Sequence, residues 1–134
     1  MNIARGAVIA VANGEQLKLY KNTAATPELS LEEIDLGDMP DVNAGSGGRH
    51  GSSEANPDSS QLREDNFAAG VAALLNKATP ERKIEELYIV AAPRTLGELR
   101  KHLSKQVEAV IAAEVSKDLT GHPIKDVEKA LMAA

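Results

Sequence analysis

The first third of the chain has a pattern of hydrophobic and turn-forming residues that predicts an antiparallel hairpin. Residues 6–12 are a continuous apolar run, and Asn13-Gly14 follows it directly. Asn-Gly between apolar runs is a strong hairpin signal, because a type I′ turn needs two residues that tolerate a positive φ. In residues 16–21 apolar and polar side chains then alternate, as they do in a strand with one buried face.

A third strand is predicted over residues 29–36. Its apolar positions change phase between Leu31 and Ile34, which indicates a β-bulge near Glu32-Glu33. Residues 37–60 are of another kind, because 17 of these 24 are Gly, Ser, Asp, Asn or Pro. A loop of this length inside a compact domain either carries function or is a flexible insertion.

From about Asp58 the apolar side chains follow the period of a helix, which Thr79-Pro80 ends. One face of this helix holds the apolar residues Phe67, Val71, Leu74, Leu75 and Ala78. Residues 87–92 then form an apolar run that suits a central parallel strand and stops at Pro93.

Thr95 and Glu98 predict a capping box at the start of a short amphipathic helix that reaches about Ser104. Residues 107–115 fit a strand or a helix, and we favour a strand because it completes a right-handed crossover. Pro123 is predicted at the first position of a C-terminal helix.

The predicted order of elements is therefore βββαβαβα. It gives an α/β fold in which a five-stranded mixed sheet is flanked by helices, the RNase H-like arrangement. All 134 residues are expected to form a single domain, with the Gly/Ser-rich loop at 37–60 as its one long connection.

Composition narrows the possible partners. Aromatic residues are 2% of the chain, namely Tyr20, Phe67 and Tyr88, so the core must be aliphatic. Phe67 and Tyr88 are expected in the core or at its edge, which leaves only Tyr20 for stacking and excludes a base-stacking platform. The net charge of −5 excludes a globally basic nucleic-acid binder, and the absence of cysteine excludes disulfides and thiolate chemistry.

The local chemistry points to anion binding. The loop contains Gly47, Gly48, Arg49 and His50, in which adjacent glycines permit close approach of a backbone or a phosphate beside one cation. Four bases could offer a basic helix face to phosphates, namely Arg94, Arg100, Lys101 and Lys105. Such a run of charge is also found on ordinary solvated faces.

The residues predict no catalytic set, no metal site and no cofactor. The first strand lacks the carboxylate that RNase H-like nucleases use for magnesium, and His50, His102 and His122 have no metal-binding spacing. The start of the chain lacks a basic signal region, and no run approaches the roughly 20 apolar residues of a membrane span. We expect a cytoplasmic protein with no membrane partner; the oligomeric state stays open.

Several segments together resemble the bacterial host-attachment protein family. The segment from Leu87 through Pro93, Arg94 and Gly97 to Arg100 resembles one family motif, and a second motif contains Lys117, Asp118 and Thr120. The turn at Asn13-Gly14 is similar to that family's opening turn, where Asp is usual. Pro93 and Gly97 also have structural explanations, the end of a strand and close packing. The resemblance implies a protein required for attachment to host cells.

That family's fold also resembles the middle domain of archaeal and eukaryotic class-I release factors. Their Gly-Gly-Gln loop enters the peptidyl-transferase centre, and Gly47-Gly48 lie in the matching place with Arg49 instead of Gln. The expected function is a non-enzymatic, release-factor-like module that binds ribosomal RNA or another polyanion through the Gly-rich loop. The alternatives are a hydrolase of the peptidyl-tRNA-cleaving type and an attachment factor.

Overall fold

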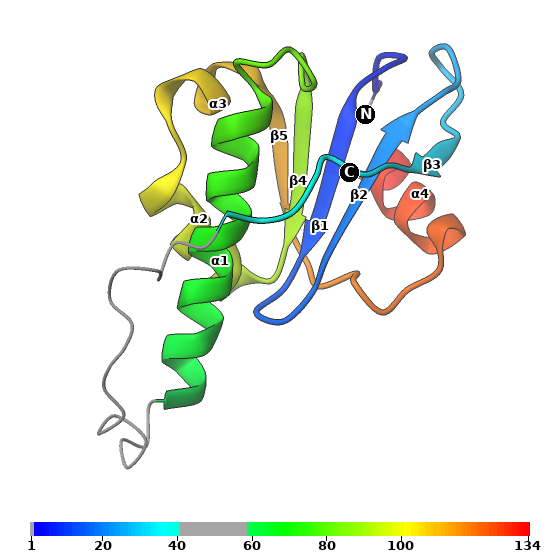
Figure 1. Cartoon of the computed structure of the whole chain (residues 1–134). Coiled ribbons are helices and arrows are strands. Elements are labelled where there is room, and N and C mark those ends of the chain that lie inside the picture. The colour runs from blue at the N-terminus through cyan, green and yellow to red at the C-terminus, as the bar shows by residue number, and fades with distance from the viewer. Residues whose placement is uncertain (1, 41–58) are drawn as a thin grey trace.

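The computed structural model describes residues 2–40 and 59–134, which form a five-stranded mixed sheet flanked by helices (Figure 1). The strand order is β3-β2-β1-β4-β5, in which β3, β2 and β1 are antiparallel neighbours and β1, β4 and β5 run parallel. The predicted sheet is thereby confirmed, and its order is compatible with an RNase H-like arrangement. The strands are β1 (Val8–Ala12), β2 (Leu17–Asn22), β3 (Leu31–Glu33), β4 (Leu87–Ala91) and β5 (Ile111–Ser116).

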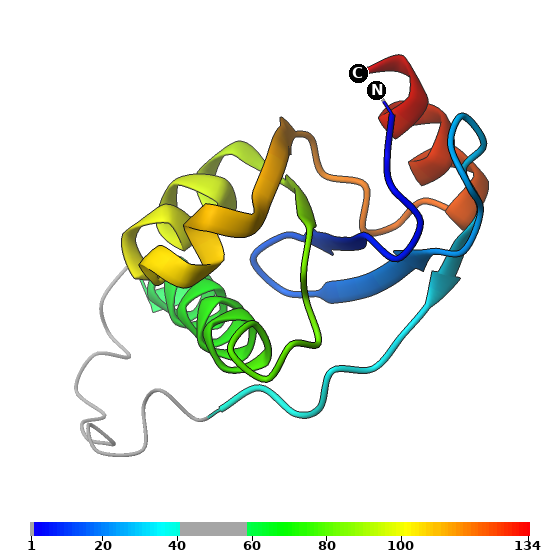
Figure 2. The ribbon, with the colours of Figure 1, turned by 90° about the horizontal axis from the view of Figure 1, so that it is seen from above.

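Helices cover both faces of the sheet. Three of them lie on one face, and the C-terminal helix lies on the other (Figure 2). Every residue of β1 and β4 is buried, because these two central strands have helices above and below them. The helices are α1 (Ser59–Ala78), α2 (Pro93–His102), α3 (Lys105–Val110) and α4 (Ile124–Ala133).

The core is divided by the sheet into two aliphatic clusters. Val8 and Ala10 of β1 pack on the side of α1, α2 and α3, whereas Ile9 and Val11 pack on the side of α4. Side chains of a strand alternate between the two faces, so a continuous apolar strand is what a two-sided core requires. The burial of Leu75 in α1 and Leu131 in α4 completes the two layers.

The predicted bulge near Glu32-Glu33 is wrong. The register between β2 and β3 is uninterrupted from Asn22↔Leu31 to Tyr20↔Glu33, and the Ile34 N–H continues it by donating to the Leu19 carbonyl at 2.9 Å. Leu31 belongs to the cluster beside α4, while Ile34 packs against the cluster beside α1. The change of phase needs no bulge, because this segment contributes apolar side chains to both faces of the sheet, and residues of opposite parity point to opposite faces.

The hairpin is confirmed, but the predicted type I′ turn is wrong. Ala12 pairs with Leu17, so the connection is the four residues from Asn13 to Gln16. Neither Asn13 nor Gly14 has a positive φ. The Asn13 side chain holds the turn instead, because its Oδ1 accepts from the backbone N–H groups of Glu15 and Gln16 at 2.8 Å each.

The expectation of a strand over 107–115 is wrong for its first half. The Ser104 hydroxyl accepts from the Val107 N–H at 3.2 Å and starts helix α3, so β5 begins only at Ile111. Val107 is fully buried in the core as a residue of this helix, so its apolar character did not require a strand. The observed order is βββαβααβα.

Two helix starts also differ from expectation. Helix α2 begins at Pro93, two residues before Thr95. The first N–H groups of a helix have no partner within the helix, and proline suits this position because it has no N–H. Thr95 is buried inside the first turn and makes no capping hydrogen bond, so the predicted capping box is wrong. Pro123 precedes helix α4 as its N-cap residue, one position before the predicted one.

The aromatic residues are placed only partly as expected. Tyr88 is buried and Phe67 lies at the edge of the core, but Tyr20 is also buried, with 3% of its surface exposed. The expectation that Tyr20 is free for stacking is therefore wrong. Gly97 does not serve close packing either, since a Cβ at this position would meet no atom within 4 Å.

Candidate functional site at the carboxyl edge of the sheet

The carboxyl ends of β1, β4 and β5 meet at one edge of the sheet, because these strands are parallel. The turn at Asn13, the start of α2 at Pro93 and the segment after Ser116 all follow strands that end there (Figure 1). The N-terminal half of α1 lies against the same edge, since a Cβ on Gly14 would be only 2.6 Å from Cγ of Glu64. Ligands of open α/β sheets bind at this kind of edge.

Asn13 links the hairpin to the segment after β5. Its Nδ2 donates to Oδ2 of Asp118 at 3.1 Å and to Oγ1 of Thr120 at 2.9 Å. Its Oδ1 accepts from the backbone N–H groups of Glu15 and Gln16 in its own turn, so both the nitrogen and the oxygen of the amide have two hydrogen-bond partners. Asn13 therefore fixes two loops that are 105 residues apart in sequence.

Asp118 and Thr120 form the other half of this cluster. The Thr120 hydroxyl donates to Oδ1 of Asp118 at 2.7 Å, and the Thr120 N–H donates to the same oxygen at 3.1 Å. The hydrogen bond from the Thr120 side chain, with that from Asn13, lowers the pKa of Asp118 below its ordinary value. Thr120 is buried, whereas Lys117 is exposed. Asp118 and Thr120 thus stabilise the loop after β5 through hydrogen bonds at this edge.

Arg94 lies at the same edge, on the first turn of α2. Its Nη2 makes a two-oxygen contact with Asp65 of α1, at 3.1 and 3.2 Å. The Gln61 amide, with its oxygen toward Arg94, accepts from Nη1 at 3.2 Å and also from Nη2. Arg94 is therefore placed over the first two turns of α1.

The other predicted anion-binding residues lie farther along α2 and at the start of α3. Arg100 pairs with Glu114 of β5, with Nη2 2.5 Å from Oε1, and Lys101 pairs with Glu98 at 2.8 Å. Lys105 is exposed, and no partner of its side chain lies within the described residues. The structure thus joins three of the four predicted cations to carboxylates rather than to one another.

In each of these pairs the cation is more exposed than the carboxylate. The side chains of Arg94, Arg100 and Lys101 are 49%, 59% and 67% exposed. Their carboxylate partners Asp65, Glu114 and Glu98 are only 26%, 23% and 14% exposed, so displacing a carboxylate from its cation costs more than the about 0–1 kcal/mol of a fully exposed ion pair. Asp65 and Glu114 were not singled out by the sequence, because nothing in their local pattern marks them as partners of residues on other elements.

The remaining candidate residues, Gly47, Gly48, Arg49 and His50, lie outside the described residues. In the part of the chain that is described, no three His, Asp or Glu side chains are grouped so that they could hold a metal ion. The same residues include no helix that is long and apolar enough to cross a membrane.

Comparison with known proteins decides the family. Residues 6–131 match the family described as Bacterial archaeo-eukaryotic release factor family 12. The chain belongs to this family. Membership confirms the release-factor-like part of the sequence prediction, and the matched residues run from β1 through most of α4.

A relative of this release-factor family 12 domain occurs in Rickettsia prowazekii, under the name "Uncharacterized protein RP470". The two proteins are 35% identical over 68 residues, which is 49% of this chain and 45% of the relative. The chain therefore matches less than half of the relative's length.

Proposed function

We propose that this domain is a non-enzymatic, release-factor-like module that binds ribosomal RNA or another polyanion at the carboxyl edge of its sheet. The contacts would come from the segment with Gly47, Gly48, Arg49 and His50 and from the bases of α2. Family membership supports the release-factor-like character. The binding of RNA is our inference from the residues.

The observation that carries the proposal is the position of Arg94. Its guanidinium contacts Gln61 and Asp65 in the first two turns of α1, and in the sequence these two residues follow Arg49 by 12 and 16 positions. A polyanion held by Arg49 and the adjacent glycines could then reach a second cation on the rigid body of the domain. Arg100 lies about 9 Å farther along α2, at 1.5 Å per residue.

The charge balance sets how such binding must behave. The domain carries a net charge of −5, so its overall field repels a polyanion, and attraction depends on a few local cations. Each phosphate contact releases counterions, which makes the affinity fall steeply with salt. We therefore expect association at low ionic strength that is lost near physiological salt unless several contacts form together.

Co-sedimentation with purified ribosomes over a salt series tests the proposal. The double variant Arg94→Ala/Arg100→Ala should bind roughly tenfold more weakly, and its slope of log K against log salt should fall by about 1–2. Arg5→Ala/Arg82→Ala is the matched control, because these two exposed arginines precede the parallel strands β1 and β4 and so lie at the opposite edge of the sheet. Absence of association at low salt, or equal weakening by the control, contradicts the proposal.

Arg49→Ala and Gly48→Pro test the Gly-rich segment by the same assay. Both should weaken binding, since one removes a cation and the other removes backbone freedom. The hydrolase and attachment alternatives remain predictions from resemblance. Release of labelled amino acid from ribosome-bound peptidyl-tRNA would replace the non-enzymatic proposal with the first of them.

A further inference from the structure

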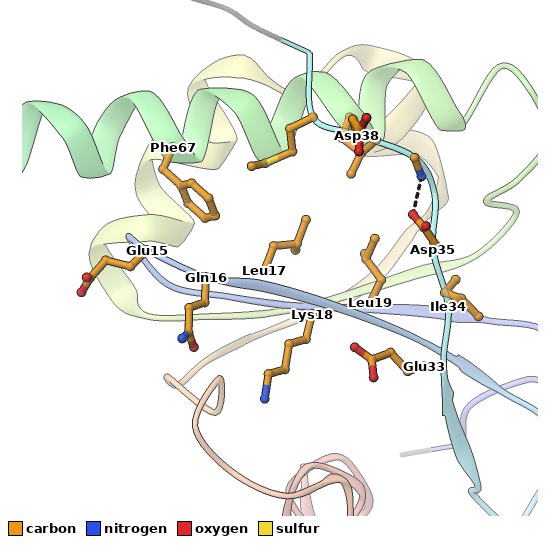
Figure 3. Close-up of a pocket in the computed structure, with 13 residues that line it drawn as sticks. Glu15, Gln16, Leu17, Lys18, Leu19, Glu33, Ile34, Asp35, Asp38 and Phe67 are labelled. Atoms are coloured by element: carbon orange, nitrogen blue, oxygen red, sulfur yellow. Dashed lines mark hydrogen bonds between the residues drawn. The ribbon is translucent and has the colours of Figure 1, made fainter.

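A groove runs between β2 and α1, away from the cations of α2. Its volume is about 570 Å³, within the usual range of ligand pockets. Leu17 and Leu19 of β2 point toward α1, and the Phe67 ring points back from α1 toward Leu17 (Figure 3). Leu74, two helical turns beyond Phe67, extends the apolar wall.

The far side of the groove is formed by the segment that follows β3. This segment leaves β2 after Ile34 and crosses to α1, where the Met39 sulfur lies 3.6 Å from the position of a Cβ on Gly70. Met39 itself is 37% exposed. Because the segment after β3 turns away from β2 toward α1, apolar surface of β2 and α1 stays open between them.

This turn away from β2 also exposes part of a strand edge. The backbone N–H of Asn22 donates to the Ala7 carbonyl, and just beyond the strands the Asn13 N–H donates to the Gln16 carbonyl. The backbone groups of even-numbered residues along β2 therefore point toward β1. The odd-numbered residues therefore face the opposite edge. Within the described residues, the last backbone hydrogen bond on that edge is Ile34 to Leu19, which leaves the Leu17 N–H and carbonyl open to the groove.

The rims of the groove are acidic. Glu15 lies at one end, and Asp35 and Asp38 lie on the far side (Figure 3). Two further charged residues, Lys18 and Glu33, line the groove and offset each other. Lys18 points away from α1. Glu33 is opposite Tyr20 in the register of β2 and β3, and since the Tyr20 side chain is buried on the α4 side, the Glu33 side chain is directed to that side too.

We propose that this groove is a docking site for an extended peptide segment of a partner protein, in which basic residues alternate with apolar ones. The peptide backbone pairs with the open edge at Leu17, and its apolar side chains enter between Leu17, Phe67 and Leu74. Its lysines or arginines then lie near the acidic rims. Strand addition of this kind takes affinity from the backbone and specificity from the side chains.

Charge distinguishes this occupant from the chain's own Gly-rich segment. Residues 41–58 contain Asp41, Glu54 and Asp58 against the single Arg49, a net charge of 1 − 3 = −2, which the acidic rims repel. The chemistry is also opposite to that of the polyanion proposed for the carboxyl edge. The two proposals are therefore independent, and either can fail alone.

Binding of a labelled probe tests the inference directly. The probe is the peptide Lys-Val-Lys-Val-Lys-Val-amide with a fluorophore on its N-terminal nitrogen, measured by fluorescence anisotropy at low and at physiological salt. The double variant Glu15→Lys/Asp38→Lys should weaken binding by roughly tenfold at low salt, because it replaces attraction by repulsion. Glu28→Lys/Glu85→Lys makes the same change of charge at exposed residues outside the groove, and it should have little effect.

Amide NMR separates strand addition from loose charge attraction. The probe should shift the Leu17 amide resonance and slow its hydrogen exchange, whereas a version with glutamate in place of lysine, or with a central proline, should do neither. The Arg94→Ala/Arg100→Ala variant should bind the probe normally. Equal binding of the glutamate peptide, an unchanged affinity in Glu15→Lys/Asp38→Lys, or a Leu17 amide that is already protected without peptide overturns the inference.

Discussion

The substitution Asn13→Ala tests whether one amide holds the carboxyl edge together. It removes four hydrogen bonds: two to the backbone N–H groups of Glu15 and Gln16, and two to the side chains of Asp118 and Thr120. No cavity is opened in the core, because Asn13 is only half-buried. The loss of stability therefore measures these polar contacts alone.

The magnitude follows from their exposure. Three of the bonds are exposed and contribute about 0.5 kcal/mol each, while the bond to Thr120 is partly buried and contributes about 1 kcal/mol. The free energy of unfolding should thus fall by about 2.5 kcal/mol. For a domain of this size 1 kcal/mol corresponds to roughly 3–4 °C, so the melting temperature should fall by about 8–10 °C.

Urea unfolding followed by circular dichroism measures the change, with Asn66→Ala as the matched control. Asn66 lies in α1 and makes no hydrogen bond through its side chain within the described residues, so its replacement should change stability by less than about 0.5 kcal/mol. A double-mutant cycle of Asn13→Ala with Asp118→Ala should give a coupling of about 0.5 kcal/mol or more. A loss below 1 kcal/mol for Asn13→Ala, or additive single effects, refutes the argument.

Three further predictions concern the same domain. Carboxyl NMR titration should place the pKa of Asp118 below 3.8, and its contribution to stability, complete above that value, should disappear as pH falls through the lower folded-state pKa. Gly14→Ala should cost about 1–2 kcal/mol in thermal unfolding, because the added Cβ would lie 2.6–2.8 Å from three carbons of Glu64, and Glu64→Ala should restore part of it. Ser104→Ala should cost about 1 kcal/mol by removing the cap on the Val107 N–H, and unchanged stability would show that α3 does not depend on it.

The sequence predicted the layers of the fold well, because hydrophobic period is a local property. A wholly apolar β1 and β4 require helices on both faces, and the helical period before Ala78 determines which face α1 presents. Prediction failed where two structures share one pattern. Alternating apolar residues around Val107 fit a strand or a helix, and the Ser104 cap decided between them.

Prediction also failed where the pattern was assumed to belong to one face. Ile34 and Leu31 appeared out of phase only on the assumption of a single core, and the two-sided core removes the conflict. Tyr20 was expected to be available for stacking because the other two aromatic residues, Phe67 and Tyr88, were assigned to the core or its edge. Its ring instead lies under α4, where desolvation raises its pKa.

The sequence by itself determined the aliphatic core, the hairpin, the strand and helix faces, and the residue types available for binding. Only the tertiary structure decided which residues meet: Asn13 with Asp118 across 105 positions, and Arg94 with Asp65 across 29. The physical reason is that periodicity records which side of an element faces the core. Hydrogen bonds and ion pairs between loops depend on where whole elements end in space, which no local pattern records.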